Sequence, residues 1–301
     1  EERLLSKLVV NEMDVWIVIN PILKVLLYAA TFMSVGAFLF SLHFAKHLTV
    51  AQKDYCNNFV FKTALVGVVT SLLMILSVAG NLGGDIVSVI EPFMLQLALE
   101  SKSGVGYSTS VVGFSGMLIA HYLKGYVKRV GLLVGSAATL LSFTMSGHSH
   151  LGGFLSQSLL IIHLFGIAFW LGALFPFRWM CLQPDQHNLS IIAHRFGVLA
   201  MGYVGLLLSA GLGYAYLLLG EVSLIFTTQY GNVLLIKVVL VVSLLSLAAL
   251  NKFMLVPSLE SRQTTAVMRF YRSVKFEIAI SLIILTASSL LTTSMTLPMG
   301  M

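Results

Sequence analysis

The stretch LSQSLLIIHLFGIAFWLGALFPF, at residues 155–177, contains no lysine, arginine, aspartate or glutamate. A helix needs about 20 mainly apolar residues to cross the hydrocarbon core of a bilayer, so this stretch predicts a membrane-spanning helix. We find seven more stretches of this kind, at roughly 16–42, 58–80, 104–123, 129–147, 196–219, 230–256 and 275–297. We therefore expect an all-α, polytopic membrane helix bundle of about eight transmembrane helices, with residues 1–301 forming a single membrane domain.

The composition of the whole chain agrees with this class. Hydrophobic residues make up 57% of the 301 residues and charged residues only 10%, and the mean hydropathy is +0.93. A soluble domain carries roughly 25% charged residues, because it must cover a surface exposed to water. The composition therefore excludes a soluble enzyme, a disordered protein, a secreted disulfide scaffold and a nucleic-acid-binding protein.

The distribution of basic residues predicts the orientation of the bundle. In membrane proteins, cytoplasmic loops carry an excess of lysine and arginine. Of the 18 such residues here, 13 lie in or beside the loops after the first, third, fifth and seventh predicted spans: Lys46, Lys53, Lys62, Lys124, Lys128, Arg129, Arg178, Arg195, Lys252, Arg262, Arg269, Arg272 and Lys275. We therefore expect a multi-pass protein of the inner (plasma) membrane with both termini in the periplasm. The net charge of +6 is then mostly a topology signal.

The connection at residues 81–103 is longer than the other loops. It reads NLGGDIVSVIEPFMLQLALESKS and carries Asp85, Glu91 and Glu100 among apolar residues. These charges interrupt the apolar run too often for a span. We expect an interfacial helix that lies on the outer side, in contact with membrane lipid.

Soft metal ligands gather where the fourth predicted span meets the fifth. Met145, His148 and His150 lie at an outer loop without charged residues. His163 follows about 12 Å into the next span, given a rise of 1.5 Å per residue. Cu(I) accepts imidazole and thioether ligands, and an ionisable residue at that depth is a functional candidate. These residues predict an outer copper site. Alternatively, His163 bonds a neighbouring helix and the loop histidines are only solvated.

Further thioether groups follow the last predicted span, also on the outer side. Met295, Met299 and Met301 lie in the sequence MTLPMGM. Thioethers suit copper in an oxidising compartment, where free thiols are lost to disulfides. We predict that Met295 and Met299 add to the outer site. The alternative is a frayed apolar tail.

Polar residues recur on one face of the last predicted span. Glu277, Ser281, Ser288, Thr292 and Met295 are spaced by three, four or seven residues, which places them on one side of a helix. They line an ion path or hold neighbouring helices together, since serine and threonine also favour helix contacts in membranes.

Two lysines and one acidic residue inside the spans need partners or access to water. For Lys24 and Lys237 we favour snorkelling to the head groups over a position inside the bundle. Glu277 and Asn251 are placed at the same depth, near the inner ends of their spans, and we expect them to meet. Lys237 lies too far from that depth to reach Glu277.

Two cysteines, Cys56 and Cys181, lie on the predicted cytoplasmic side. A thiolate in a reducing compartment is a good acceptor for Cu(I), so these residues are candidates for an exit site. The alternative, which we favour, is that they are only two unpaired cysteines in separate loops.

The motifs SGHS (146–149) and HLFGIAFWLGALF (163–175) resemble the CopD family of bacterial inner-membrane copper-resistance and copper-uptake proteins. The resemblance continues through YGNVLLIK (230–237), LAALNKFMLVPSLE (247–260) and RSVKFEIAISLIILT (272–286), so that residues 140–297 form a CopD-like core region. It implies an eight-helix bundle that moves copper from the periplasm to the cytoplasm. It also implies a partnership with a separate periplasmic copper-binding protein of the CopC kind.

The resemblance assigns six residues of this chain to family motifs: His148, His163, Trp170, Lys237, Asn251 and Glu277. It does not say which of them bind metal. His150 and the methionine-rich tail are departures from the family pattern; either they strengthen an outer copper site or they are peculiar to this chain.

The leading hypothesis is therefore copper transport, with Cu(I) favoured over Cu(II). Two alternatives remain. The first is a membrane b-type haem electron-transfer protein, with His121 and His194 as axial ligands. The second is a copper-delivery or assembly factor that uses the outer ligands without an inner site. The sequence contains no GxxxxGK[ST] or HExxH motif, so we do not expect an enzyme.

Overall fold

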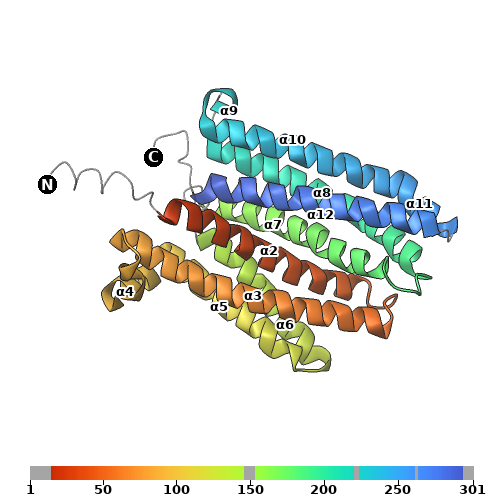
Figure 1. Cartoon of the computed structure of the whole chain (residues 1–301), viewed down its shortest axis with the longest axis horizontal. Helices are drawn as coiled ribbons and strands as arrows, with labels where there is room; N and C mark the ends of the chain where they lie inside the picture. Colours follow the sequence, from red (N-terminus) through yellow and green to blue (C-terminus); the bar gives the residue numbers. More distant parts are fainter. Residues whose placement is uncertain (1–14, 146–152, 220–223, 262–263, 294–301) are drawn as a thin grey trace.

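A computed structural model describes residues 15–145, 153–219, 224–261 and 264–293. Within these ranges the chain is helical and contains no strand. The long helices run side by side along one direction (Figure 1). Their bounds are α2 (Val15–His43), α3 (Val50–Gly83), α5 (Lys102–His121), α6 (Gly125–Met145), α7 (Gly153–Met180), α8 (Leu189–Leu219), α10 (Gln229–Leu250) and α12 (Thr264–Thr293). Shorter elements are η1 (Val87–Ile90), α4 (Pro92–Glu100), α9 (Leu224–Thr227), η3 (Asn251–Leu255), α11 (Val256–Ser258) and η4 (Leu259–Ser261).

Seven helices of the described chain are long and apolar enough to cross a membrane. α5 is the eighth predicted span and has 20 residues. Its lower hydropathy follows from its glycines and serines, which let helices approach closely in a membrane. A Cβ added at Gly113 of α5 would lie 2.9 Å from the Gly135 carbonyl oxygen of α6. The polytopic helix bundle is therefore confirmed.

The bundle has two groups of helices that meet along α2 and α7. α2, α3, α5 and α6 form one group, and α7, α8, α10 and α12 form the other (Figure 1). Gly36 of α2 faces the backbone of Ala168 and Gly172 in α7, so closely that a Cβ at Gly36 would overlap the Ala168 carbonyl. This backbone contact holds the two groups together.

The first and last described helices have their free ends at the same end of the bundle. The Ser289 hydroxyl of α12 donates to the Pro21 carbonyl of α2 over 2.7 Å, and the hydroxyls of Tyr28 and Thr292 are 3.5 Å apart. We call this the outer end, because the lysine and arginine distribution assigns it to the periplasm.

α3 begins earlier than predicted. Thr49 and Gln52 form a capping box, in which each side chain accepts from the other's backbone N–H. This cap starts the helix at Val50 instead of near residue 58, because it satisfies backbone donors that a helix start otherwise leaves free. Cys56 therefore lies in a helix and not in a loop.

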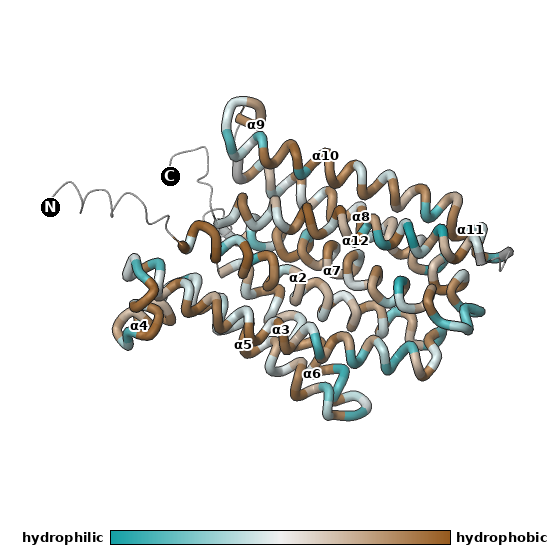
Figure 2. The backbone as a smooth tube through the Cα atoms, in the orientation of Figure 1, coloured by the Kyte–Doolittle hydropathy of each residue, from teal (hydrophilic) through white to brown (hydrophobic). Residues whose placement is uncertain are grey.

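The segment at 81–103 forms the expected short helix at the outer end. Gly84, at φ 81°, ends α3, and η1 and α4 follow. The side chains of Ile86, Val87, Ile90 and Phe93 are between 66% and 76% exposed. Figure 2 shows this apolar segment beyond the end of the long helices, where exposed apolar groups suit the lipid interface.

Candidate ion path

His163 lies on α7 and is held by α8. Its Nδ1 is 3.0 Å from the Leu207 carbonyl oxygen. A Cβ added at Gly211 of α8 would lie 2.8 Å from this ring, so the glycine makes room for it. A carbonyl oxygen only accepts, so Nδ1 carries the proton and Nε2 keeps its lone pair. Histidines that ligate metals are commonly fixed in this way by a carbonyl on the opposite nitrogen.

Lys237 of α10 is the residue whose charge acts electrostatically on His163. It is half-buried. When Lys237 carries its proton, its positive charge weakens the hold of any cation bound to Nε2.

Lys24 lies inside the bundle, and the snorkelling that we favoured for it is wrong. Its side chain is 4% exposed. Its Nζ lies 5.7 Å from the ring centre of Tyr28, 5.2 Å from that of Tyr107 and 5.5 Å from that of Phe143. It also donates to the Tyr107 hydroxyl over 3.4 Å. Aromatic ring faces attract a cation, and here they replace the head groups as its surroundings.

Glu277 of α12 is 3% exposed and bonds two other helical elements. The Trp170 indole Nε1 of α7 donates to Oε2 over 3.0 Å. The Asn251 amide nitrogen donates to Oε1, which confirms the expected meeting of these two residues. The contact between Trp170 and Glu277 could not be read from spacing, although both residues belong to the quoted motifs.

Asn251 begins a π-helical turn, η3, at the end of α10. Pro257 explains the widened turn, because proline has no N–H and its ring collides with the carbonyl four residues earlier in an α-helix. π-helical turns occur frequently at functional sites. The turn positions the Asn251 amide against α12.

The predicted polar face of α12 is only partly buried. Ser281 is buried, as Glu277 is. Ser288 donates to its own helix at Ile284, and Thr292 is exposed next to Tyr28. Ser289, which the prediction missed, is the fully buried hydroxyl at the α2 contact. The adjacent serines fit the helical spacing equally well, so the sequence could not separate them.

The predicted outer copper site lies largely outside the described residues. His148, His150, Met295 and Met299 all fall in the ranges 146–152 and 294–301. Met145 ends α6 and is 38% exposed, and its sulfur accepts from the Thr109 hydroxyl over 3.6 Å. The described chain contains no group of three or more histidine, cysteine, aspartate or glutamate side chains that could hold a metal ion.

The inner end of the bundle is closed over both cysteines. Cys56 is 1% and Cys181 5% exposed. Gln52 and Asn188 exchange two hydrogen bonds, of 2.9 Å and 2.8 Å, and Asn188 also donates to the His47 carbonyl. Burial raises the pKa of the Cys181 thiol to about 12. Cys181 is therefore a buried thiol in this structure, and the exit site suggested by the sequence stays a prediction.

The two histidines considered for haem have separate surroundings. His121 ends α5 and packs on Phe61 of α3, with ring centres 4.7 Å apart. His194 lies exposed near the start of α8. The structure shows no contact that prepares them as an axial pair within the described ranges.

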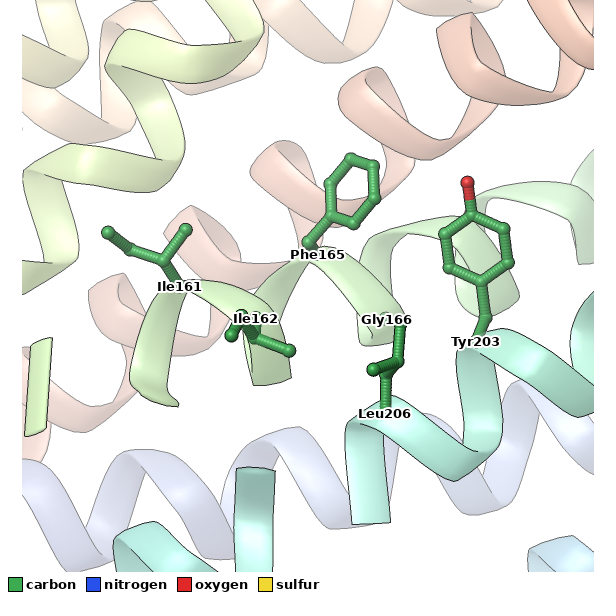
Figure 3. A pocket seen from close by; sticks show the side chains of 6 residues that line it. All are labelled: Ile161, Ile162, Phe165, Gly166, Tyr203 and Leu206. Carbon is green, nitrogen blue, oxygen red and sulfur yellow. The ribbon is translucent and has the colours of Figure 1, made fainter. Parts of the chain in front are cut away.

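One pocket follows the seam between α7 and α8 (Figure 3). It measures about 230 Å³ and is lined by Ile161, Ile162, Phe165, Gly166, Tyr203 and Leu206. The Tyr203 hydroxyl is bound to His43, 3.1 Å away. The apolar lining offers no ligand to a metal ion, so this pocket is not a copper site.

Two family models match the chain. Residues 13–157 match "Copper resistance protein D-like, N-terminal domain", and residues 191–291 match "Copper resistance protein D". The second range contains Lys237, Asn251 and Glu277, while His163 and Trp170 lie between the two ranges. The resemblance stated above for the second half therefore extends to the first.

Two curated relatives are similar over most of their length. "Inner membrane protein YebZ" of Escherichia coli (strain K12) is 26% identical over 248 residues, which are 76% of this chain and 81% of the relative. "Copper resistance protein D" of Pseudomonas syringae pv. tomato is 25% identical over 240 residues, 73% of this chain and 76% of the relative. No solved structure matches the chain. With both halves matched and a bundle of membrane-length helices, this chain belongs to the copper resistance protein D (CopD) family and is a multi-pass inner-membrane protein.

Proposed function

We propose that this protein carries copper across the inner membrane from the periplasm to the cytoplasm. The family assignment supports copper as the substrate. The observation that carries the proposal is the state of His163, whose Nδ1 is occupied by the Leu207 carbonyl while Nε2 is left as an acceptor. An imidazole prepared for a metal ion, inside a membrane-spanning helix, fits a transport site.

The ion enters at the outer ligands Met145, His148 and His150, with Met295 and Met299 as further thioethers. Thioether and imidazole ligands favour Cu(I) over Cu(II). A separate periplasmic protein of the CopC kind delivers the ion to this end. These ligands stand on the sequence alone, apart from Met145.

His163 binds the ion next, and Lys237 keeps that binding weak. Conduction requires a site that is attractive enough to enter and weak enough to leave. The imidazole supplies the attraction, and the charge of Lys237 opposes it. On the inner side the ion passes Cys56 and Cys181, which requires the contact between Gln52 and Asn188 to open.

The experiment compares His163→Ala with His187→Ala. His187 is an exposed histidine whose ring bonds Asp185 at 3.0 Å, outside the bundle, so it is the matched control. Proteoliposomes receive Cu(I) under anaerobic conditions, and internal copper is measured. We expect uptake to fall at least about tenfold in His163→Ala, equivalent to about 1.4 kcal/mol, and to be unchanged in His187→Ala. Equal uptake by both variants would reject His163 as the transport ligand.

The closed inner end favours a second candidate function, which is delivery of periplasmic copper to a membrane partner without transport. Both thiols are buried, and Asn188 bonds Gln52 and His47 at the same end of the bundle. Under this function, a Cys56→Ser/Cys181→Ser variant binds copper normally and liposome uptake is absent even in the wild type. Copper uptake that depends on the cysteines would exclude it.

A further inference from the structure

The two partners of Glu277 differ in what they can do. The Trp170 indole can only donate, whereas the Asn251 amide carries both donors and an acceptor. At present the indole nitrogen donates to Oε2 and the amide nitrogen to Oε1. One partner is therefore fixed in its role, and the other can reverse it.

The acceptor of the Asn251 amide is unused. Its Oδ1 is buried and has no hydrogen-bond partner among the described residues. A buried polar atom without a partner is uncommon and needs an explanation. A half-turn of the amide about its last side-chain bond places Oδ1 where Nδ2 now lies, against Oε1 of Glu277.

This half-turn matches the two protonation states of a carboxyl group. As an anion, Glu277 accepts from both Trp170 and Asn251. After one proton binds to Oε1, the carboxyl donates that proton to Asn251 Oδ1, while Oε2 continues to accept from Trp170. One O–H bond forms or breaks, and the proton is exchanged with water at the end of the path. We propose that Glu277 binds and releases a proton in this protein. We also propose that the Asn251 amide rotates by a half-turn each time Glu277 gains or loses that proton.

The backbone and a neighbouring hydroxyl support both parts of the proposal. Asn251 begins the π-helical turn, where the Val256 N–H bonds the Asn251 carbonyl, so the amide sits at an irregular point of its helix. Ser273 lies one turn nearer the inner end of α12, and its hydroxyl is also buried without a partner in the described chain. It offers the next oxygen for a proton that moves toward the cytoplasm.

Charged residues on the elements around Glu277 have other contacts or face away. The Glu277 carboxyl accepts hydrogen bonds from Trp170 and Asn251. On α2, His43 bonds Tyr203, and Lys24 lies among aromatic rings. On η3, Lys252 donates to the Gly197 carbonyl. The remaining groups of the packed elements are His163 and Lys237 toward the outer end, and the exposed Arg178, Glu260, Arg269, Arg272 and Lys275.

The proton and the transported ion exclude each other. A protonated Glu277 is neutral, so proton binding removes the negative charge that would otherwise balance a cation in the low-dielectric interior. The anionic form of Glu277 attracts a cation, and the protonated form does not. Arrival of Cu(I) therefore releases the proton from Glu277. This coupling rests on the proposed function, whereas the proton site itself does not.

Infrared difference spectroscopy of the full-length protein in lipid nanodiscs tests the proton site without copper. We expect a titrating protonated-carboxyl band in the wild type that shifts in D2O. The band should be lost in Glu277→Gln and retained in Glu260→Gln, which removes an exposed acid of η4. In Asn251→Leu the band should change frequency, since the carboxyl loses its acceptor. Identical spectra for wild type and Glu277→Gln would overturn the proposal.

If Glu277→Gln does not yield folded protein, Trp170→Phe tests the proposal instead. It preserves an aromatic ring but removes the donor to Oε2, so the titration midpoint of the same band must move. An unmoved midpoint would contradict the assignment.

Anaerobic addition of Cu(I) then tests the coupling. We expect the band to disappear in the wild type and to persist in His163→Ala. A band that persists in wild type with bound copper overturns the coupling. Should neither protein take up copper while the band still titrates with pH, copper transport fails and the proton site stands.

Discussion

Lys24 and Glu277 are both ionisable and buried within membrane-length helices, yet their surroundings are opposite in kind. Lys24 faces three aromatic rings at 5.2 Å to 5.7 Å and one hydroxyl. Glu277 faces an indole and an amide. Ring faces attract a cation but cannot exchange roles with it, whereas an amide can either donate or accept. Burial alone therefore does not identify a functional ionisable residue. The hydrogen-bonding chemistry of the residues around it does.

Lys24 and Glu277 also belong to different halves of the bundle. Lys24 connects α2 with α5 and α6, and Glu277 connects α12 with α7 and the end of α10. The first group of helices thus encloses a lysine among aromatic rings, and the second encloses a carboxyl group between an indole and an amide. The two groups of helices meet mainly where α2 packs on α7, and α12 also packs on α2.

The largest expected effect, a loss of folded protein, comes from forcing the two groups of helices apart. Gly172→Leu places a side chain against the backbone of Gly36, and we expect almost no folded protein in size-exclusion chromatography after mild detergent extraction. Gly202→Leu is the control, because nothing lies within 4 Å of a Cβ added there. A normal yield of folded Gly172→Leu would show that the two groups do not depend on this contact.

A smaller effect on stability compares Glu277 and Lys24 directly. Trp170→Phe and Tyr107→Phe each preserve a ring and remove one hydrogen-bonding group. Loss of a donor to a carboxylate should cost about 1–3 kcal/mol, and loss of the Tyr107 hydroxyl about 0.5–1 kcal/mol because Lys24 keeps its three rings. Thermal unfolding in one detergent measures both. An equal or larger loss in Tyr107→Phe would mean that the hydroxyl, and not the rings, holds Lys24.

Apolar stretches predicted the fold well, because the bilayer requires each span to be long and apolar on its own. The start of α3 was missed although its signal was present, since Thr49 and Gln52 have capping-box spacing. Tertiary contacts were harder. Asn251 and Glu277 could be matched by depth, but two of the three rings around Lys24 come from α5 and α6, far away in sequence. The local ring of Tyr28, four residues along α2, does not by itself distinguish such an enclosure from snorkelling.

The Cys56 and Cys181 predictions show a second limit. Residue type and compartment indicated accessible thiolates, but accessibility depends on how loops fold back. Gln52 and Asn188 close that end through hydrogen bonds between segments that the sequence does not connect. The outer ligands His148 and His150 remain predictions from the sequence.

The smallest expected effect is a local change in hydrogen exchange at Asp85. Asp85 accepts two hydrogen bonds, as Glu277 does, but it lies in water and not inside the bundle. Its Oδ1 accepts from the Ser88 N–H and hydroxyl, each at 2.7 Å, and these bonds lower its pKa. A lowered folded-state pKa means that the contacts are complete at neutral pH and are lost as the pH falls below about 4. Hydrogen exchange of residues 86–90 should therefore accelerate, relative to intrinsic rates, only in acid. Asp85→Ala should lose protection at every pH, and Asp85→Asn, which keeps an acceptor without a titrating group, should show protection independent of pH. Acid sensitivity that survives in Asp85→Asn would assign the effect to another group.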